Sequence, residues 1–181
     1  ADDPLASLQD ELRAGLLHYW HTAGSILQGS GVLLNPPPED YLSLERNFFS
    51  ALFLYSYSRG GIARERRVLY VAVNQCLRGM VTGCDNLLDD EYKATLDTDL
   101  PRGAVRFRSV LDIMVSDRVL FEILLALSGK GQISLEVARL ASAASLRTLA
   151  RSGAQEASEE SGVSLRPGPE EVLERVHHFK T

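Results

Sequence analysis

Apolar residues recur at helical spacing along most of the chain, and strand-like alternation is not sustained in any segment. The stripe is plain at the start, where apolar side chains follow one another three or four positions apart from Leu5 to Ala23. Gly- and Pro-rich stretches interrupt the pattern, and such stretches end helices. The pattern predicts helices at 5–28, 39–58, 62–93, 104–127 and 133–161, and a last helix that begins at Pro169. We therefore expect one all-α domain over residues 1–181.

Composition and charge narrow the class of protein. Of the 181 residues, 45% are hydrophobic and 24% are charged, which is typical of globular chains and excludes wholesale disorder. The net charge of −5 argues against a nucleic-acid-binding protein, and no apolar run reaches the ~18 residues of a membrane span. Residues 1–4 do not resemble a signal peptide. Cys76 and Cys84 lie too far apart on one predicted helix for a disulfide, so we expect reduced thiols and a cytoplasmic protein.

The candidate chemistry is concentrated in an acidic cluster near the end of the predicted helix 62–93. Asp85 and Asp89 lie four residues apart and share a helix face, and Asn86 and Asp90 form a second such pair. Like charges at this spacing repel one another, unless a cation or a basic partner offsets the repulsion. Hard oxygen ligands suit Mg²⁺, which usually takes one or two carboxylates and completes its shell with water and phosphate oxygens. The same cluster is also compatible with a solvated acidic helix end.

Basic residues follow the cluster, and arginine binds phosphate oxygens through two parallel hydrogen bonds. An acidic cluster, a loop that carries arginine and then a helix form a reasonable order for a Mg²⁺–diphosphate site. Each of these cations, taken singly, also fits a surface charge or an ion pair. The residues are Lys93, Arg102, Arg106, Arg108 and Arg118.

From about residue 40 to residue 181, the chain resembles the trans-isoprenyl diphosphate synthases, the polyprenyl synthetase family. The segment Asp85-Asn86-Leu87-Leu88-Asp89 is similar to the first aspartate-rich motif of that family, with Asn86 at its second position. The other similar segments follow in the family's order: Pro101-Arg102-Gly103, Ser116-Asp117, Gly153-Ala154-Gln155-Glu156 and Lys180-Thr181.

The resemblance implies an all-α bundle like the isoprenoid synthase, or class I terpenoid synthase, fold. It also implies a Mg²⁺-dependent prenyltransferase that ionises an allylic diphosphate and condenses it with isopentenyl diphosphate. Metal ligands would be Asp85, Asp89, Asn86 and Asp90, and diphosphate would be held by Arg102, Lys180 and Arg78. The implied catalytic residues are Asp85, Asp89 and Lys180, and the implied floor of the chain-length pocket is Met80 and Val81.

Departures from the family pattern leave alternatives open. The Gly-Gly-Lys-x-x-Arg-Pro motif that helps to bind isopentenyl diphosphate is not recognisable, although Gly60-Gly61 retains its glycines. This loss favours a class I terpene cyclase, which ionises a prenyl diphosphate without a second substrate. A non-catalytic partner subunit is the third hypothesis. The family is usually dimeric, and the apolar and Ala-rich helices suit a homodimer.

Length adds one further expectation. Family members are longer and carry a second aspartate-rich motif on a later helix, and no such motif follows Lys180-Thr181. We therefore expect this chain to be the N-terminal portion of a longer protein, so that the fold is incomplete in the sequence given.

Overall fold

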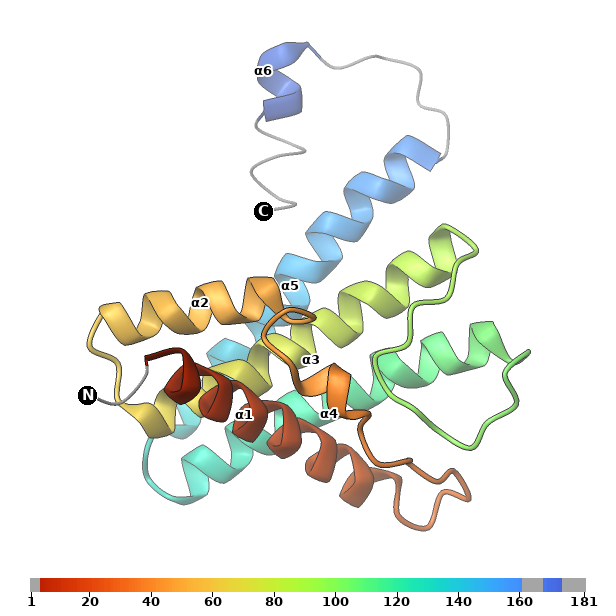
Figure 1. Ribbon diagram of the computed structural model, residues 1–181. Helices are drawn as coiled ribbons and strands as arrows, with labels where there is room; N and C mark the ends of the chain where they lie inside the picture. Colours follow the sequence, from red (N-terminus) through yellow and green to blue (C-terminus); the bar gives the residue numbers. More distant parts are fainter. Residues whose placement is uncertain (1–3, 161–167, 174–181) are drawn as a thin grey trace. The chain divides into compact units, whose positions relative to one another are not determined.

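A computed structural model describes residues 4–160 and 168–173 of the chain (Figure 1). Over these ranges the secondary structure is helical, and the sole β-type pairing is an isolated bridge between Leu34 and Thr98. The all-α prediction is confirmed. In the order of the chain, the elements are α1 (Pro4–Leu27), the 3₁₀-helix η1 (Glu39–Leu42), α2 (Phe48–Arg59), α3 (Arg64–Leu88), α4 (Val105–Gly129), α5 (Leu135–Glu160) and α6 (Pro169–Val172).

The chain divides into two compact units, residues 1–126 and residues 127–181. The first unit contains α1, η1, α2, α3 and most of α4, and the second contains α5 and α6. Among the described helices, none is both long enough and apolar enough to span a bilayer.

The core of the first unit forms where α1, α2 and α3 pack against one another (Figure 1). Leu12, Leu16 and Tyr19 of α1 are fully buried, as is Val71 of α3. The two helices approach closely at Gly15, where an added Cβ would lie 2.5 Å from the Cβ of Val71. Glycine at this position therefore lets the two backbones meet.

A second close crossing joins α3 to α4. An added Cβ at Gly83 would lie 2.6 Å from Cγ1 of Ile113 and 2.8 Å from the carbonyl oxygen of Ser109, and one at Gly79 would clash with the Ser116 side chain. The Ser116 hydroxyl is hydrogen-bonded to the Tyr19 hydroxyl at 2.9 Å. These contacts hold α4 against α3 near the acidic cluster.

Two helix boundaries differ from the predicted ones by more than two residues; side-chain hydrogen bonds explain the first, and backbone conformation explains the second. The helix predicted from residue 39 begins at Phe48, because Nδ2 of Asn47 donates to the carbonyl oxygens of Tyr41 and Ser43 and holds a turn before it. The helix predicted to reach residue 93 ends at Leu88. Asp90 has a positive φ of 53°, which no α-helix accommodates.

The loop of residues 89–104, which follows the acidic cluster, is firmly packed. Thr95, Leu96 and Thr98 are buried in it. Residues 33–35 pair with residues 97–99, because the amide of Asn35 donates to the carbonyl oxygen of Asp97 at 2.9 Å and the amide of Asp99 donates to that of Leu33 at 3.0 Å. The loop is thus part of the folded core rather than a free tether.

Candidate functional site

The two carboxylates of the predicted metal site lie at the C-terminal end of α3. Asp85 occupies the last turn, and Asp89 is the C-cap residue, whose amide donates to the carbonyl oxygen of Asp85 at 2.8 Å. Both residues are exposed. One helical turn separates them, so their side chains leave the helix about 6 Å apart on one face.

The structure gives the neighbouring polar residues different surroundings. Asn86 is buried, its Oδ1 accepts from the amide of Lys93 at 2.9 Å, and its Nδ2 donates to the Lys93 carbonyl oxygen at 3.0 Å. Asn86 therefore fixes the loop against α3. Asp90 lies past the helix end, so the expected helical pairing of Asn86 with Asp90 is absent, and Asp90 is within 3.9 Å of exposed Arg106.

The electrostatic surroundings of the cluster are negative. The pKa of Lys93 is raised, first by its hydrogen bond to Glu91 and then by the charges of Glu91, Asp89 and Asp85. Burial, and secondly the charge of Asp85, raises the pKa of Cys84. The C-terminal end of a helix also carries partial negative charge, so carboxylates there favour a bound cation.

The predicted diphosphate ligands are distributed unevenly. Arg78 is exposed on α3, seven residues before Asp85 and about 10 Å along the same face. Arg102 is exposed in the loop of residues 89–104. Lys180 lies outside the described residues. Arg108, one of the cations that follow the cluster, is buried, with its Cζ 4.8 Å from the ring centroid of Tyr92.

The two residues predicted to floor a chain-length pocket point to different sides of α3. Val81 is 43% exposed and lies on the face of Arg78 and Asp85, whereas Met80 is 5% exposed and belongs to the core. Of the two, Val81 is the residue that a molecule bound along this face could contact.

A pocket of about 470 Å³, the α2–α3 pocket, lies beside Arg78. One part of its lining is aromatic and exposed: Phe48, Phe49 and Phe53 from the first turns of α2. The other part is polar, and its members are Arg46, Asn47, Ser50, Asn74 and Arg78. Such a lining suits an amphiphile that has an anionic head and an apolar body.

Sequence reasoning did not identify Arg46 and Asn74 as site residues. Nδ2 of Asn74 is buried and has no hydrogen-bond partner among the described residues. Arg78 donates to Oδ1 of Asn47 at 2.9 Å, which orients its guanidinium at the pocket. Helical spacing could have identified Asn74, because it lies four residues before Arg78 and shares the helix face of Asp85.

A buried carboxyl group lies beneath the loop of residues 89–104. Asp112 of α4 is 2% exposed, and its burial raises its pKa from 3.8 to about 6, against hydrogen bonding from Thr95 and the charge of Arg108. The Oδ2 atom of Asp112 has no partner among the described residues. Tyr41 ties the loop down on another side, because its hydroxyl donates to the carbonyl oxygen of Thr95 at 2.9 Å.

The donor set of Asp85 and Asp89 is compatible with Mg²⁺. Both donors are hard oxygens, they lie within one turn, and water can reach them. Within the described ranges no group of three or more His, Cys, Asp or Glu side chains is arranged to hold a metal ion. A cation here would thus depend on two carboxylates, with water and substrate oxygens as its other ligands.

Comparison with protein-family models, with curated proteins and with solved structures finds no match to this chain. The resemblance to prenyl synthases consequently rests on the motifs of the chain itself.

Proposed function

We propose that the protein is a Mg²⁺-dependent prenyltransferase of isoprenoid biosynthesis, which ionises an allylic diphosphate and condenses it with isopentenyl diphosphate. The observation that carries this proposal is one continuous face of α3. Asp89, Asp85, Val81 and Arg78 follow one another along it, and the α2–α3 pocket lies at its far end. Carboxylates, an apolar stretch and a cation are the groups that a prenyl diphosphate requires.

Each group of this face has a separate task. Asp85 and Asp89 would hold Mg²⁺, which supplies neutralisation of the diphosphate charge as that group leaves. Arg78 and Arg102 would bind diphosphate oxygens through paired hydrogen bonds. Val81 and the phenylalanines of α2 would contact the hydrocarbon and exclude water, which would otherwise quench the cation formed by ionisation.

The direct test is an assay with radiolabelled isopentenyl diphosphate, geranyl diphosphate and Mg²⁺. We expect label in a longer, solvent-extractable product, and Asp85→Asn should lower its formation by roughly 100-fold or more, as expected when metal-based charge stabilisation is lost. Asp10→Asn is the matched control, because Asp10 is an exposed aspartate on α1. Failure of the wild-type chain to extend any allylic primer would refute the prenyltransferase.

A class I terpene cyclase is the second candidate, and one contact favours it. Of the arginines that follow Gly60-Gly61, Arg67 is engaged by buried Glu11, with Nε 2.7 Å from Oε2. Arg64 also approaches Glu11, at 3.9 Å. These cations are thereby less available to a second diphosphate. Release of a terpene hydrocarbon or alcohol from geranyl or farnesyl diphosphate alone, detected by gas chromatography, would identify the cyclase.

A non-catalytic partner subunit is the remaining alternative, and it predicts no turnover in either assay and no effect of Asp85→Ala on partner binding.

The proposed prenyltransferase is also expected to be a homodimer. The dimer is supported by the exposed apolar side chains of Phe107, Met114 and Phe121 on one face of α4. Light scattering on the eluting protein gives the mass, and a monomer at micromolar concentration would contradict the dimer.

A further inference from the structure

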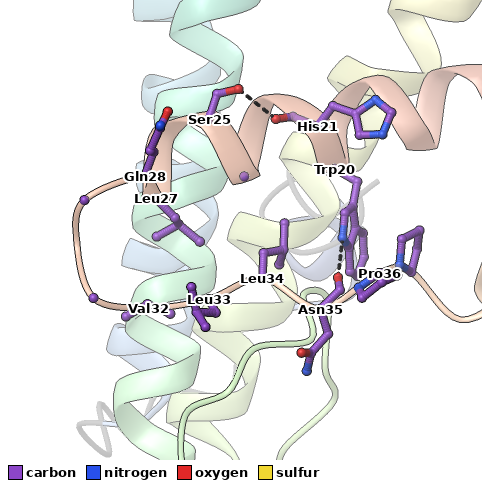
Figure 2. A pocket seen from close by; sticks show the side chains of 14 residues that line it. Trp20, His21, Ser25, Leu27, Gln28, Val32, Leu33, Leu34, Asn35 and Pro36 are labelled. Atoms are coloured by element: carbon purple, nitrogen blue, oxygen red, sulfur yellow. Dashed lines mark hydrogen bonds between the residues drawn. The ribbon is translucent and has the colours of Figure 1, made fainter.

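A second cavity, of about 750 Å³, lies between the C-terminal half of α1 and the loop of residues 28–37 (Figure 2). We call it the α1–loop pocket. Trp20 and Leu27 line it from the helix, and Leu33, Leu34 and Pro36 line it from the loop. Figure 2 shows Leu27 and Leu34 between the helix and the loop. The volume is within the range of small-molecule sites.

The wall of the α1–loop pocket is held in place from both sides. On the helix side, Nε1 of Trp20 donates to the carbonyl oxygen of Asn35 at 2.8 Å (Figure 2). On the opposite side, the amide of Leu33 donates to Oδ1 of Asp99 at 2.8 Å, and Asn35 is bonded to Asp97. Because these bonds fix residues 33–35, this wall of the cavity is in place before any ligand binds.

The lining has no ionised side chain to match a charged ligand. Its residues include no Asp, Glu, Lys or Arg, and His21 is its one titratable group. The carboxylates of Asp97 and Asp99 are hydrogen-bonded to the loop on its other side. Their negative charge repels anions. The polar side chains of the lining are His21, Ser25, Gln28 and Asn35, and the exposed His21, Ser25 and Gln28 could each bond to a hydroxyl.

Apolar surface is left uncovered at this cavity. Leu33 is 68% exposed although its backbone is fixed at both ends. A hydrocarbon chain that covered it would gain the free energy of removing apolar area from water, with little cost in ordering the loop.

We infer that the α1–loop pocket is a binding site for a neutral molecule with a hydrocarbon chain and at most a hydroxyl head. The site shares no residue with the α2–α3 pocket or with the acidic cluster. The inference does not depend on the proposed prenyltransferase, so either can fail without the other.

Trp20 makes the test direct, because it is the one tryptophan of the chain. The full chain is titrated with decan-1-ol, and binding is followed by Trp20 emission and by calorimetry. We expect a saturable change in the emission intensity and a stoichiometry of one. Decanoate, which has the same length and a charged head, should bind at least fivefold more weakly. Equal binding of decanoate would refute the neutral class, and an unsaturable or multiple uptake of decan-1-ol would refute the site.

Two variants remove the site in different ways. Leu33→Gln makes the wall polar at an exposed position, and the affinity for decan-1-ol should fall roughly tenfold. Gly24→Leu fills the cavity from α1, where an added Cβ would lie 3.8 Å from Leu34, at ordinary contact distance. Leu125→Gln, at an exposed position of α4, is the matched control and should bind like the wild type. Unchanged binding by both pocket variants would refute the site.

Discussion

At the scale of single residues, the pair of Glu11 and Arg67 is the clearest test of buried charge. Glu11 is 1% exposed, and two of its contacts to Arg67 measure 2.5 and 2.7 Å. Glu11→Gln leaves a largely buried guanidinium without its counter-charge. We expect the free energy of unfolding to fall by about 3 kcal/mol, measured by urea denaturation.

The control for Glu11 is a more exposed pair that joins α1 to η1. Arg13 and Glu39 form a salt bridge at 2.9 Å, with side chains 44% and 82% exposed, and such solvent-exposed pairs contribute little to stability. Glu39→Gln should leave the urea midpoint unchanged. Equal midpoints for the two variants would show that burial adds nothing to the Glu11 pair.

Asp112 gives a pH dependence with a definite sign. Its pKa in the folded protein, about 6, exceeds the ordinary 3.8, so the folded state holds the proton more tightly than the unfolded state does. The resulting stability is complete below about pH 4 and is lost as the pH rises to about 6, beyond which the curve is flat. A shift of this size corresponds to ~3 kcal/mol.

The measurement compares unfolding free energies of the wild type and Asp112→Asn between pH 4 and pH 7. As the pH rises, the free energy of unfolding of the wild type should fall by up to ~3 kcal/mol relative to that of Asp112→Asn. Glu122→Gln, on the exposed face of α4, should run parallel to the wild type. If the difference in unfolding free energy between the wild type and Asp112→Asn stays constant with pH, the pKa of Asp112 is not raised by folding, and its carboxyl group is in contact with water.

These residues also show what sequence reasoning could find. The spacing of Asp85 and Asp89 placed both on one turn of a helix, because that relation depends only on helical periodicity. The burial of Asp112 and the bonds from Asn86 to Lys93 depend on where the loop of residues 89–104 returns against the helices. No local pattern encodes that return.

At the scale of helices, close crossings at glycine fix the position of α4. Gly83→Ala places a Cβ within 2.8 Å of the Ser109 carbonyl oxygen, which is backbone and cannot turn aside. We expect α3 and α4 to be pushed apart and the free energy of unfolding to fall by about 1–3 kcal/mol, measured by urea denaturation.

Gly24→Ala is the companion variant, because Gly24 is also helical but has room for a methyl group. Alanine there should raise stability by about 0.5–1 kcal/mol through helix propensity. A Gly83→Ala protein as stable as the Gly24→Ala protein would mean that α3 and α4 are not in close contact at that point.

The helices themselves followed from periodicity, whereas two of their ends did not. The helical spacing of apolar residues predicted the central parts of α1, α3, α4 and α5. The start of α2 depends on the Asn47 side chain, and the end of α3 depends on the backbone of Asp90. The first is a choice between helix and turn that a polar side chain makes locally, and the second is set by backbone conformation.

At the scale of the whole molecule, the described core is concentrated in the first unit. Apart from Ala138, every buried hydrophobic side chain of the described residues lies at or before Leu124. The hydrogen bonds that fix the loops of residues 28–37 and 89–104 also lie within residues 1–126. A chain that ends at Gly131, past the end of α4, therefore retains the contacts that define this unit.

We expect the fragment of residues 1–131 to unfold in one cooperative transition and to keep the near-ultraviolet circular dichroism of Trp20, which is buried against Tyr41 at a ring separation of 5.2 Å. Because Asp85 and Asp89 belong to this unit, a Mg²⁺-dependent rise in melting temperature seen in the full chain should persist in the fragment. Asp85→Asn should abolish that rise in both. A fragment without a cooperative transition would show that residues 132–181 are required for the first unit to fold.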